Sequence, residues 1–105
     1  MNYLNEILLG DSVNLLKQIP SNSVDLTVTS PPYDNMRTYN GKVKDSKFDD
    51  YFSFPFVDMA TELFRVTKDG GIVVWVVNDQ IINGGESGNS FRQALKFQEL
   101  GFKIY

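Results

Sequence analysis

The chain has 105 residues and a formal net charge of −3, with 42 % hydrophobic and 22 % charged residues. These values are typical of one soluble globular domain or of part of one. Because the sequence contains no cysteine and no histidine, it excludes disulfides, thiolate chemistry, a histidine general base and the usual zinc sites. No signal peptide is visible, and no apolar run approaches the roughly 20 residues of a membrane span. We therefore expect a cytoplasmic protein without a membrane partner.

The first elements are a short strand predicted over residues 5–9 and a helix predicted over residues 12–18. The helix places Val13, Leu16 and Ile19 on one face. Asp11 or Ser12 can cap it, because a side-chain oxygen at that position accepts a backbone N–H of the first turn. A turn follows at residues 20–23.

The central feature is a β-branched run over residues 24–29 that ends in Ser30-Pro31-Pro32-Tyr33. The run has the composition of a buried strand. Two prolines cannot continue it, so a stiff extended segment is expected at its carboxyl end, where open α/β sheets bind ligands. Ser30 offers a hydroxyl, and Tyr33 offers a flat face on which a base can stack with roughly 1–3 kcal/mol. The alternative is a simple strand exit with a tyrosine covering the core.

A polar loop is predicted over residues 34–47. Between residues 33 and 48 the chain carries four basic and two acidic residues, whereas the rest carries six basic and eleven acidic ones. The four basic residues are Arg37, Lys42, Lys44 and Lys47. Because Lys and Arg make most phosphate contacts, this loop is the predicted nucleic-acid-binding segment. A solvated loop that happens to be basic is the alternative.

The second half of the chain alternates between helices and strands. A helix starting near residues 49–50 and ending at Gly70-Gly71 carries one apolar stripe, consisting of Phe52, Phe56, Met59, Leu63 and Val66. Residues 72–77 are apolar on both faces, which predicts a central parallel strand covered on both sides. A glycine-rich flexible turn over residues 80–89, a helix over residues 90–100 and a strand from residue 102 follow. Phe91, Ala94, Leu95, Gln98 and Leu100 give that helix its apolar face. The predicted order is β-α-β-α-β-α-β, hence a mostly parallel sheet.

Residues 25–33 read Asp-Leu-Thr-Val-Thr-Ser-Pro-Pro-Tyr. This segment resembles the Asp/Asn/Ser-Pro-Pro-aromatic catalytic motif of the S-adenosylmethionine-dependent DNA amino-methyltransferases, which methylate N6 of adenine or N4 of cytosine. The resemblance implies a partial Rossmann-like methyltransferase sheet, a single partial catalytic domain over residues 1–105, S-adenosyl-L-methionine as cofactor and double-stranded DNA as partner.

The resemblance also implies roles for individual residues. The catalytic residues would be Ser30, Pro31, Pro32 and Tyr33. Ser30 would also contact the cofactor, and Asp11 resembles the acid that accepts a hydrogen bond from the cofactor's adenine amine. Serine at the first motif position resembles the cytosine-N4 group more than the adenine group. The target is therefore expected to be cytosine N4 rather than adenine N6.

The sequence lacks the glycine-rich cofactor motif Phe-x-Gly-x-Gly of that family. We therefore expect a truncated or processed chain that is inactive alone, with the missing half supplied in cis or in trans. Exposed strand edges would also favour self-association. Three alternatives remain. One is a non-catalytic remnant or partner subunit, another is an amino-methyltransferase acting on RNA or on protein glutamine, and the third is a purely structural α/β domain.

Overall fold

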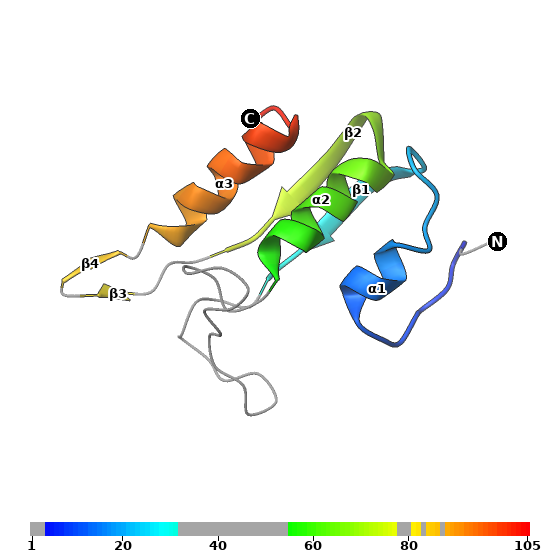
Figure 1. Ribbon diagram of the computed structural model, residues 1–105, viewed down its shortest axis with the longest axis horizontal. Helices are drawn as coiled ribbons and strands as arrows, with labels where there is room; N and C mark the ends of the chain where they lie inside the picture. Colours follow the sequence, from blue (N-terminus) through cyan, green and yellow to red (C-terminus); the bar gives the residue numbers. More distant parts are fainter. Residues whose placement is uncertain (1–3, 32–54, 78–80, 83, 87) are drawn as a thin grey trace.

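The computed structural model describes residues 4–31, 55–77, 81–82, 84–86 and 88–105 (Figure 1). The elements in chain order are α1 (Ser12–Leu16), β1 (Val24–Thr29), α2 (Phe56–Val66), β2 (Thr67–Trp75), β3 (Ile81–Ile82), β4 (Gly85–Glu86) and α3 (Asn89–Leu100). None of the helices in the described ranges is long and apolar enough to cross a membrane.

The centre of the fold is a parallel pair formed by β1 and β2. The register pairs Leu26 with Ile72 and continues to Thr29 opposite Trp75. The chain passes from β1 to β2 through α2, so these three elements form a βαβ unit. The strand predicted over residues 24–29 and its parallel pairing are confirmed.

The core lies on one face of this sheet, between the strands and the helices α2 and α3 (Figure 1). Its buried side chains are Phe56, Ala60 and Leu63 of α2 and Phe97 of α3, and Val73 and Trp75 of β2 pack against them. The aromatic rings of this region contact one another edge to face, with centroids 5.0 to 5.8 Å apart. Such pairs add specific geometry to the apolar burial. The apolar stripe predicted for α2 therefore forms core from Phe56 onward, whereas Phe52 lies outside the described residues.

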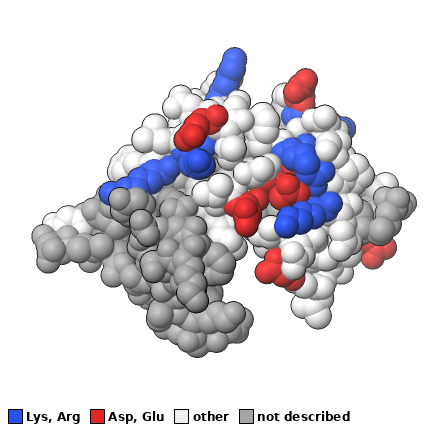
Figure 2. Space-filling model, in the orientation of Figure 1, with Lys and Arg blue, Asp and Glu red and all other residues white. Residues whose placement is uncertain are grey.

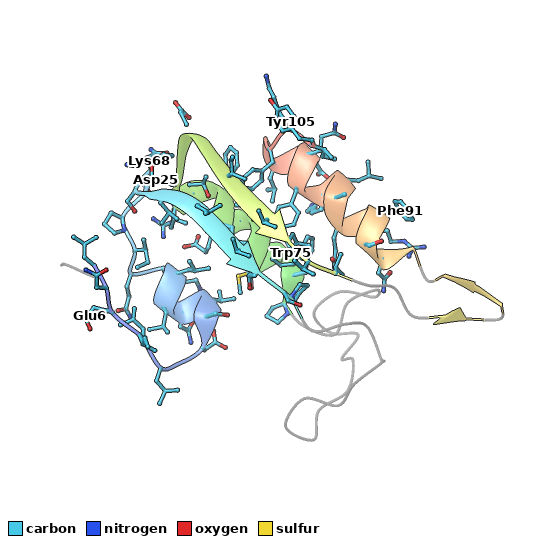
Figure 3. The ribbon with its side chains drawn as sticks, turned by 180° about the vertical axis from the view of Figure 1, so that it is seen from behind. Glu6, Asp25, Lys68, Trp75, Phe91 and Tyr105 are labelled. Carbon is cyan, nitrogen blue, oxygen red and sulfur yellow. The ribbon has the colours of Figure 1, made fainter. Side chains whose placement is uncertain are left out.

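The opposite face of the sheet carries no helix among the described residues, and Figure 3 looks onto it. Leu26 and Val28 are 58 % and 65 % exposed there, and Ile72 is 59 % exposed. The prediction that strand 72–77 is covered on both sides is thus met on one side only. Side chains alternate along a strand, and this alternation directs the more apolar residues of β1 away from α2.

Two predicted strands are absent from the structure. Residues 5–9 and 102–105 form no strand, and Ile7 and Leu9 are 99 % and 102 % exposed. A strand exists only where a neighbour supplies ladder hydrogen bonds, and no described segment pairs with either stretch. The predicted order β-α-β-α-β-α-β is therefore correct for the βαβ unit and for the helices, and wrong for the first and last strands.

The helix boundaries also differ from the predictions. α1 ends at Leu16 rather than at residue 18, and α2 ends at Val66 rather than at the glycine pair. Thr67 already has extended dihedral angles, φ −76° and ψ 130°. Gly70 instead adopts φ +80° inside β2, where the register between the strands shifts. Gly70 can occupy this irregular position of the strand because a residue without a Cβ readily adopts the left-handed conformation. The predicted start at residues 49–50 lies outside the described residues.

The helix predicted over residues 90–100 is confirmed as α3, which begins one residue earlier and ends before Gly101. Its predicted apolar face is wrong in part, because Phe91 and Leu95 are 67 % and 62 % exposed while Gln93 is buried. The glycine-rich segment before it contains the antiparallel pair of β3 and β4 rather than an irregular turn.

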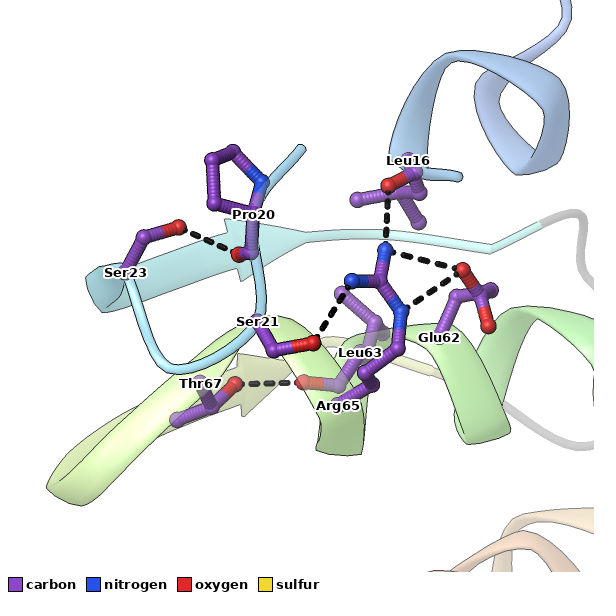
Figure 4. A network of polar contacts seen from close by, with 8 residues as sticks. All are labelled: Leu16, Pro20, Ser21, Ser23, Glu62, Leu63, Arg65 and Thr67. Atoms are coloured by element: carbon purple, nitrogen blue, oxygen red, sulfur yellow. Dashed lines mark hydrogen bonds and ion pairs between the residues drawn. The ribbon is translucent and has the colours of Figure 1, made fainter. Parts of the chain in front are cut away.

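Arg65 joins α2 to the end of α1 and to the turn before β1 (Figure 4). Its Nη2 donates to the carbonyl of Leu16 at 2.8 Å, and its Nη1 donates to Ser21 Oγ at 3.0 Å. Its Nε also donates to Glu62 Oε1 at 3.0 Å. One guanidinium thus joins three chain segments, which uses the fixed fork of arginine donors.

Replacing Arg65 by methionine should lower the free energy of unfolding by about 1–3 kcal/mol, because partly buried acceptors lose their donor. Urea denaturation followed by circular dichroism measures this change. Lys96→Met is the matched control, because the Lys96 ammonium pairs with the largely exposed Glu99 at 3.6 Å. A surface pair of that kind contributes about 0–1 kcal/mol. Equal losses in both variants would contradict the bridging role of Arg65.

Candidate functional site

A cavity of about 240 Å³ lies at the carboxyl ends of β1 and β2. It is lined by the end of β1 with Ser30 and Pro31, by Asp11 and Ser12 at the start of α1, and by single side chains such as Met59 of α2 and Trp75 of β2. Ligands of open α/β sheets bind at this edge. The cavity is therefore the candidate functional site.

The motif begins where the parallel pairing ends. The Thr29 carbonyl accepts a hydrogen bond from the Val76 N–H at 2.9 Å, and Ser30 follows at once. Pro31 is buried, whereas Ser30 is exposed at the residue level and lines the cavity. The predicted placement of this segment at a strand's carboxyl end is thus what the structure shows. Pro32 and Tyr33 lie outside the described residues.

Asp11 is the N-cap of α1. Its Oδ1 accepts the Asn14 N–H at 3.1 Å, and its carbonyl accepts the Leu15 N–H at 2.9 Å. The predicted cap is confirmed. The hydrogen bond to the helix fixes the carboxylate at the cavity, while Oδ2 has no partner within the described part of the chain. One oxygen can therefore hold the helix while the other accepts from a ligand.

The structure brings Asp11 and Ser30 to one cavity although they lie on different segments of the chain. Both were predicted as cofactor-binding residues, and that role stays a prediction. Trp75 and Met59 also line the cavity and were not predicted there. The signal for Trp75 was available, because it lies near the carboxyl end of the strand that pairs with β1.

The described surface carries mixed charges. On the face in Figure 2, Lys and Arg side chains are interspersed with Asp and Glu. Lys68 pairs with Asp25 at 3.2 Å, and Figure 3 shows this pair at the other end of the sheet from Trp75. The predicted DNA-binding residues Arg37, Lys42, Lys44 and Lys47 lie outside the described residues.

Comparison with known proteins assigns the family. The family model N6_N4_Mtase, described as DNA methylase, matches residues 24–105. The chain therefore belongs to the DNA methylase family, as the Ser-Pro-Pro-Tyr motif predicted. Methyltransferases of this family take their methyl group from S-adenosylmethionine.

Individual relatives agree with this assignment. Over 83 residues, 79 % of this chain, it is 55 % identical to "Orphan methyltransferase M.BamHII" of Bacillus amyloliquefaciens and covers 28 % of that protein. It is 35 % identical over 83 residues, again 79 % of the chain, to "Type II methyltransferase M.BglII" of Bacillus subtilis, covering 22 % of it. Over 62 residues, 59 % of the chain, it is 40 % identical to "Type II methyltransferase M.ScaI" of Streptomyces caespitosus, covering 19 %. The chain thus spans between 19 % and 28 % of the length of these relatives.

Substitutions of Asp11 can separate the stabilising effect of its helix cap from that of its carboxylate charge. Asp11→Asn keeps a cap of equal quality, whereas Asp11→Ala should lower stability by about 0.5–2 kcal/mol. Thermal and urea unfolding of the two variants and of the unchanged chain measure this difference. If Asp11→Asn destabilised the chain as much as Asp11→Ala, the carboxylate charge rather than the cap would stabilise α1.

Proposed function

We propose that this chain is the catalytic-motif part of an S-adenosylmethionine-dependent DNA amino-methyltransferase and forms a single partial domain over residues 1–105. The observation that carries the proposal is the shared cavity of Asp11, Ser30 and Pro31 at the carboxyl ends of β1 and β2. Membership of the DNA methylase family supplies the class of reaction.

The residues present fit part of the cofactor. The Asp11 carboxylate keeps one oxygen for an amine donor, and Met59 and Trp75 supply apolar surface. Pockets for drug-sized ligands have roughly 300–1,000 Å³, so a cavity of about 240 Å³ suits one planar ring rather than a complete cofactor. The bound cofactor would supply the methyl group. Asp11 and Ser30 are the residues that we assign to holding it.

The motif residues would prepare the target base. A base inside a duplex must be flipped out, which costs a few kcal/mol, and Tyr33 would then stack on it. The exocyclic amine would donate to Ser30 Oγ and to the Pro31 carbonyl. That amine is a poor nucleophile, because its lone pair is delocalised into the ring. Two acceptors favour a tetrahedral nitrogen with a localised lone pair, so orientation and fixed dipoles provide the rate enhancement.

We propose cytosine N4 as the preferred target over adenine N6, because serine occupies the first motif position. Double-stranded DNA is the proposed partner, held by the basic segment with Arg37, Lys42, Lys44 and Lys47. RNA and protein glutamine are the competing substrates of this chemistry. The sequence of the basic segment favours DNA, since phosphate neutralisation dominates the affinity for a duplex.

A second candidate is a subunit that is completed by another polypeptide. Two observations favour it, namely the coverage of about a quarter of the relatives' length and the exposed apolar face of the sheet. We propose that the chain alone is inactive and that the missing part acts in cis or in trans. Self-association through unpaired strand edges would compete with that assembly.

Replacing the matching segment of M.BamHII by this chain should give a hybrid enzyme. We expect this hybrid to transfer labelled methyl groups to DNA, and not to RNA or protein pools. Tyr33→Ala in the hybrid should lower kcat/KM by about 5- to 150-fold, the equivalent of one stacking contact. Ser30→Asp keeps an acceptor and should lose less than Ser30→Ala. Lys96→Met, far from the motif in sequence, is the control. Unchanged turnover of Tyr33→Ala would refute the stacking role.

Calorimetric titration of S-adenosylmethionine into the isolated 105-residue chain should show no binding in the micromolar range. The reason is that the chain lacks the glycine-rich part of the pocket. Micromolar binding would contradict this expectation and would mean that self-association or another segment completes the pocket. Light scattering during size-exclusion chromatography distinguishes these two cases, because only the first requires a dimer.

A further inference from the structure

Trp75 occupies a defined position beside the motif. It pairs in register with Thr29, the last residue of β1, and both residues line the cavity. Its Nε1 donates to Gln93 Oε1 of α3 at 2.9 Å. Gln93 is 2 % exposed, so an amide is buried in the core at the point where it can accept this hydrogen bond. Buried polar groups of this kind are retained with a partner because an unpaired one is costly.

Two aromatic contacts also fix the indole. The rings of Phe56 and Phe97 meet it edge to face, with centroids 5.8 and 5.0 Å away and interplanar angles of 64° and 73°. Trp75 therefore has its orientation set by α2 and by α3 at once. Figure 3 shows it at the carboxyl end of β2. A side chain held in this way is preorganised, which reduces the entropy lost when a ligand packs against it.

The hydrogen bond determines what the indole can offer to a ligand. Nε1 is its single donor and the side chain has no acceptor, so with Nε1 bonded to Gln93 the indole offers a ligand apolar ring surface rather than a further donor. Asp11 and Ser30 supply oxygen acceptors at other points of the same cavity. The combination matches a planar ring that carries an exocyclic amine, since the ring packs on the indole and the amine donates to an oxygen.

From this geometry we propose that Trp75 is a wall on which an amine-bearing nucleobase packs, and that Gln93 is the positioning residue that holds this wall. The proposal rests on the proposed function for the choice of a nucleobase. The ring can belong to the cofactor's adenosyl group or to the flipped base, because both have this chemistry.

Trp75 is the only tryptophan of the chain, so its emission reports on the site directly. Adenosine, cytidine and S-adenosylhomocysteine are titrated into the 105-residue chain in the millimolar range, with ribose as the non-planar control. Saturable quenching by a nucleoside and none by ribose is expected. Cytidine binding above adenosine binding indicates the target base, and tighter binding of S-adenosylhomocysteine than of adenosine indicates the cofactor ring.

Variants test the positioning role. Gln93→Met keeps size and removes the acceptor, and it should weaken nucleoside binding about 2- to 10-fold, as expected for one hydrogen bond. Gln98→Met on the exposed side of α3 should bind as the unchanged chain does. Gln93→Glu restores an acceptor oxygen and should recover affinity. Circular dichroism verifies that each variant is folded.

Asp11→Asn keeps the helix cap and provides a second probe of the cavity if Gln93→Met does not fold. It should also weaken saturable quenching, because the free carboxylate oxygen faces the same ligand. Quenching that never saturates, or that is as strong in folded Gln93→Met and in Asp11→Asn as in the unchanged chain, would overturn the inference. The proposed function fails separately, when the segment-exchanged methyltransferase transfers no methyl group while nucleosides still quench Trp75.

Discussion

The parallel pairing of β1 with β2 is the constraint on which the site depends. The register places Thr29 opposite Trp75, and one further hydrogen bond joins the Thr29 carbonyl to Val76. Both strands therefore end at the same level, and the residues that follow β1 emerge beside the end of β2. Because Pro31 has no N–H and restricts its own φ, the chain leaves the sheet there instead of extending it. The backbone hydrogen bonds between the strands thus place the acceptors of Ser30 and Pro31 at the carboxyl end of the sheet.

A second set of contacts brings Asp11 to that edge. Asp11 holds the first turn of α1, and the carbonyl of Leu16 at the other end of α1 accepts from Arg65 of α2. α2 in turn packs its buried face against β2. The position of the Asp11 carboxylate is therefore set by a short helix that it caps itself and whose other end is bonded to α2. This is a rigid support for a side chain whose second oxygen stays available to a ligand.

The sequence was sufficient for the parts of the fold that depend on local chemistry. The β-branched run before Ser-Pro-Pro predicts β1, the acidic residue before α1 predicts its cap, and the apolar spacing predicts α2. The errors have a common cause, since each depends on contacts that are distant in sequence. The glycine pair at residues 70–71 fits a helix end as well as a strand irregularity, and pairing with β1 decides between them. Glutamine is a residue type that is usually exposed, but Gln93 is buried, and the hydrogen bond from Trp75 compensates the burial of its amide oxygen.

The two faces of the sheet differ in a way that bears on the size of the complete catalytic unit. Leu26, Val28 and Ile72 are more than half exposed on the face where the described residues place no helix, whereas Thr27 and Thr29 alternate toward the covered side. Parallel strands are almost always buried on both faces, and a contiguous aliphatic surface in water marks a contact site. Relatives of this chain are more than three times as long as the segment that they share with it. The exposed apolar face and the small share of the relatives' length agree with our proposal that a further part of a methyltransferase covers this surface.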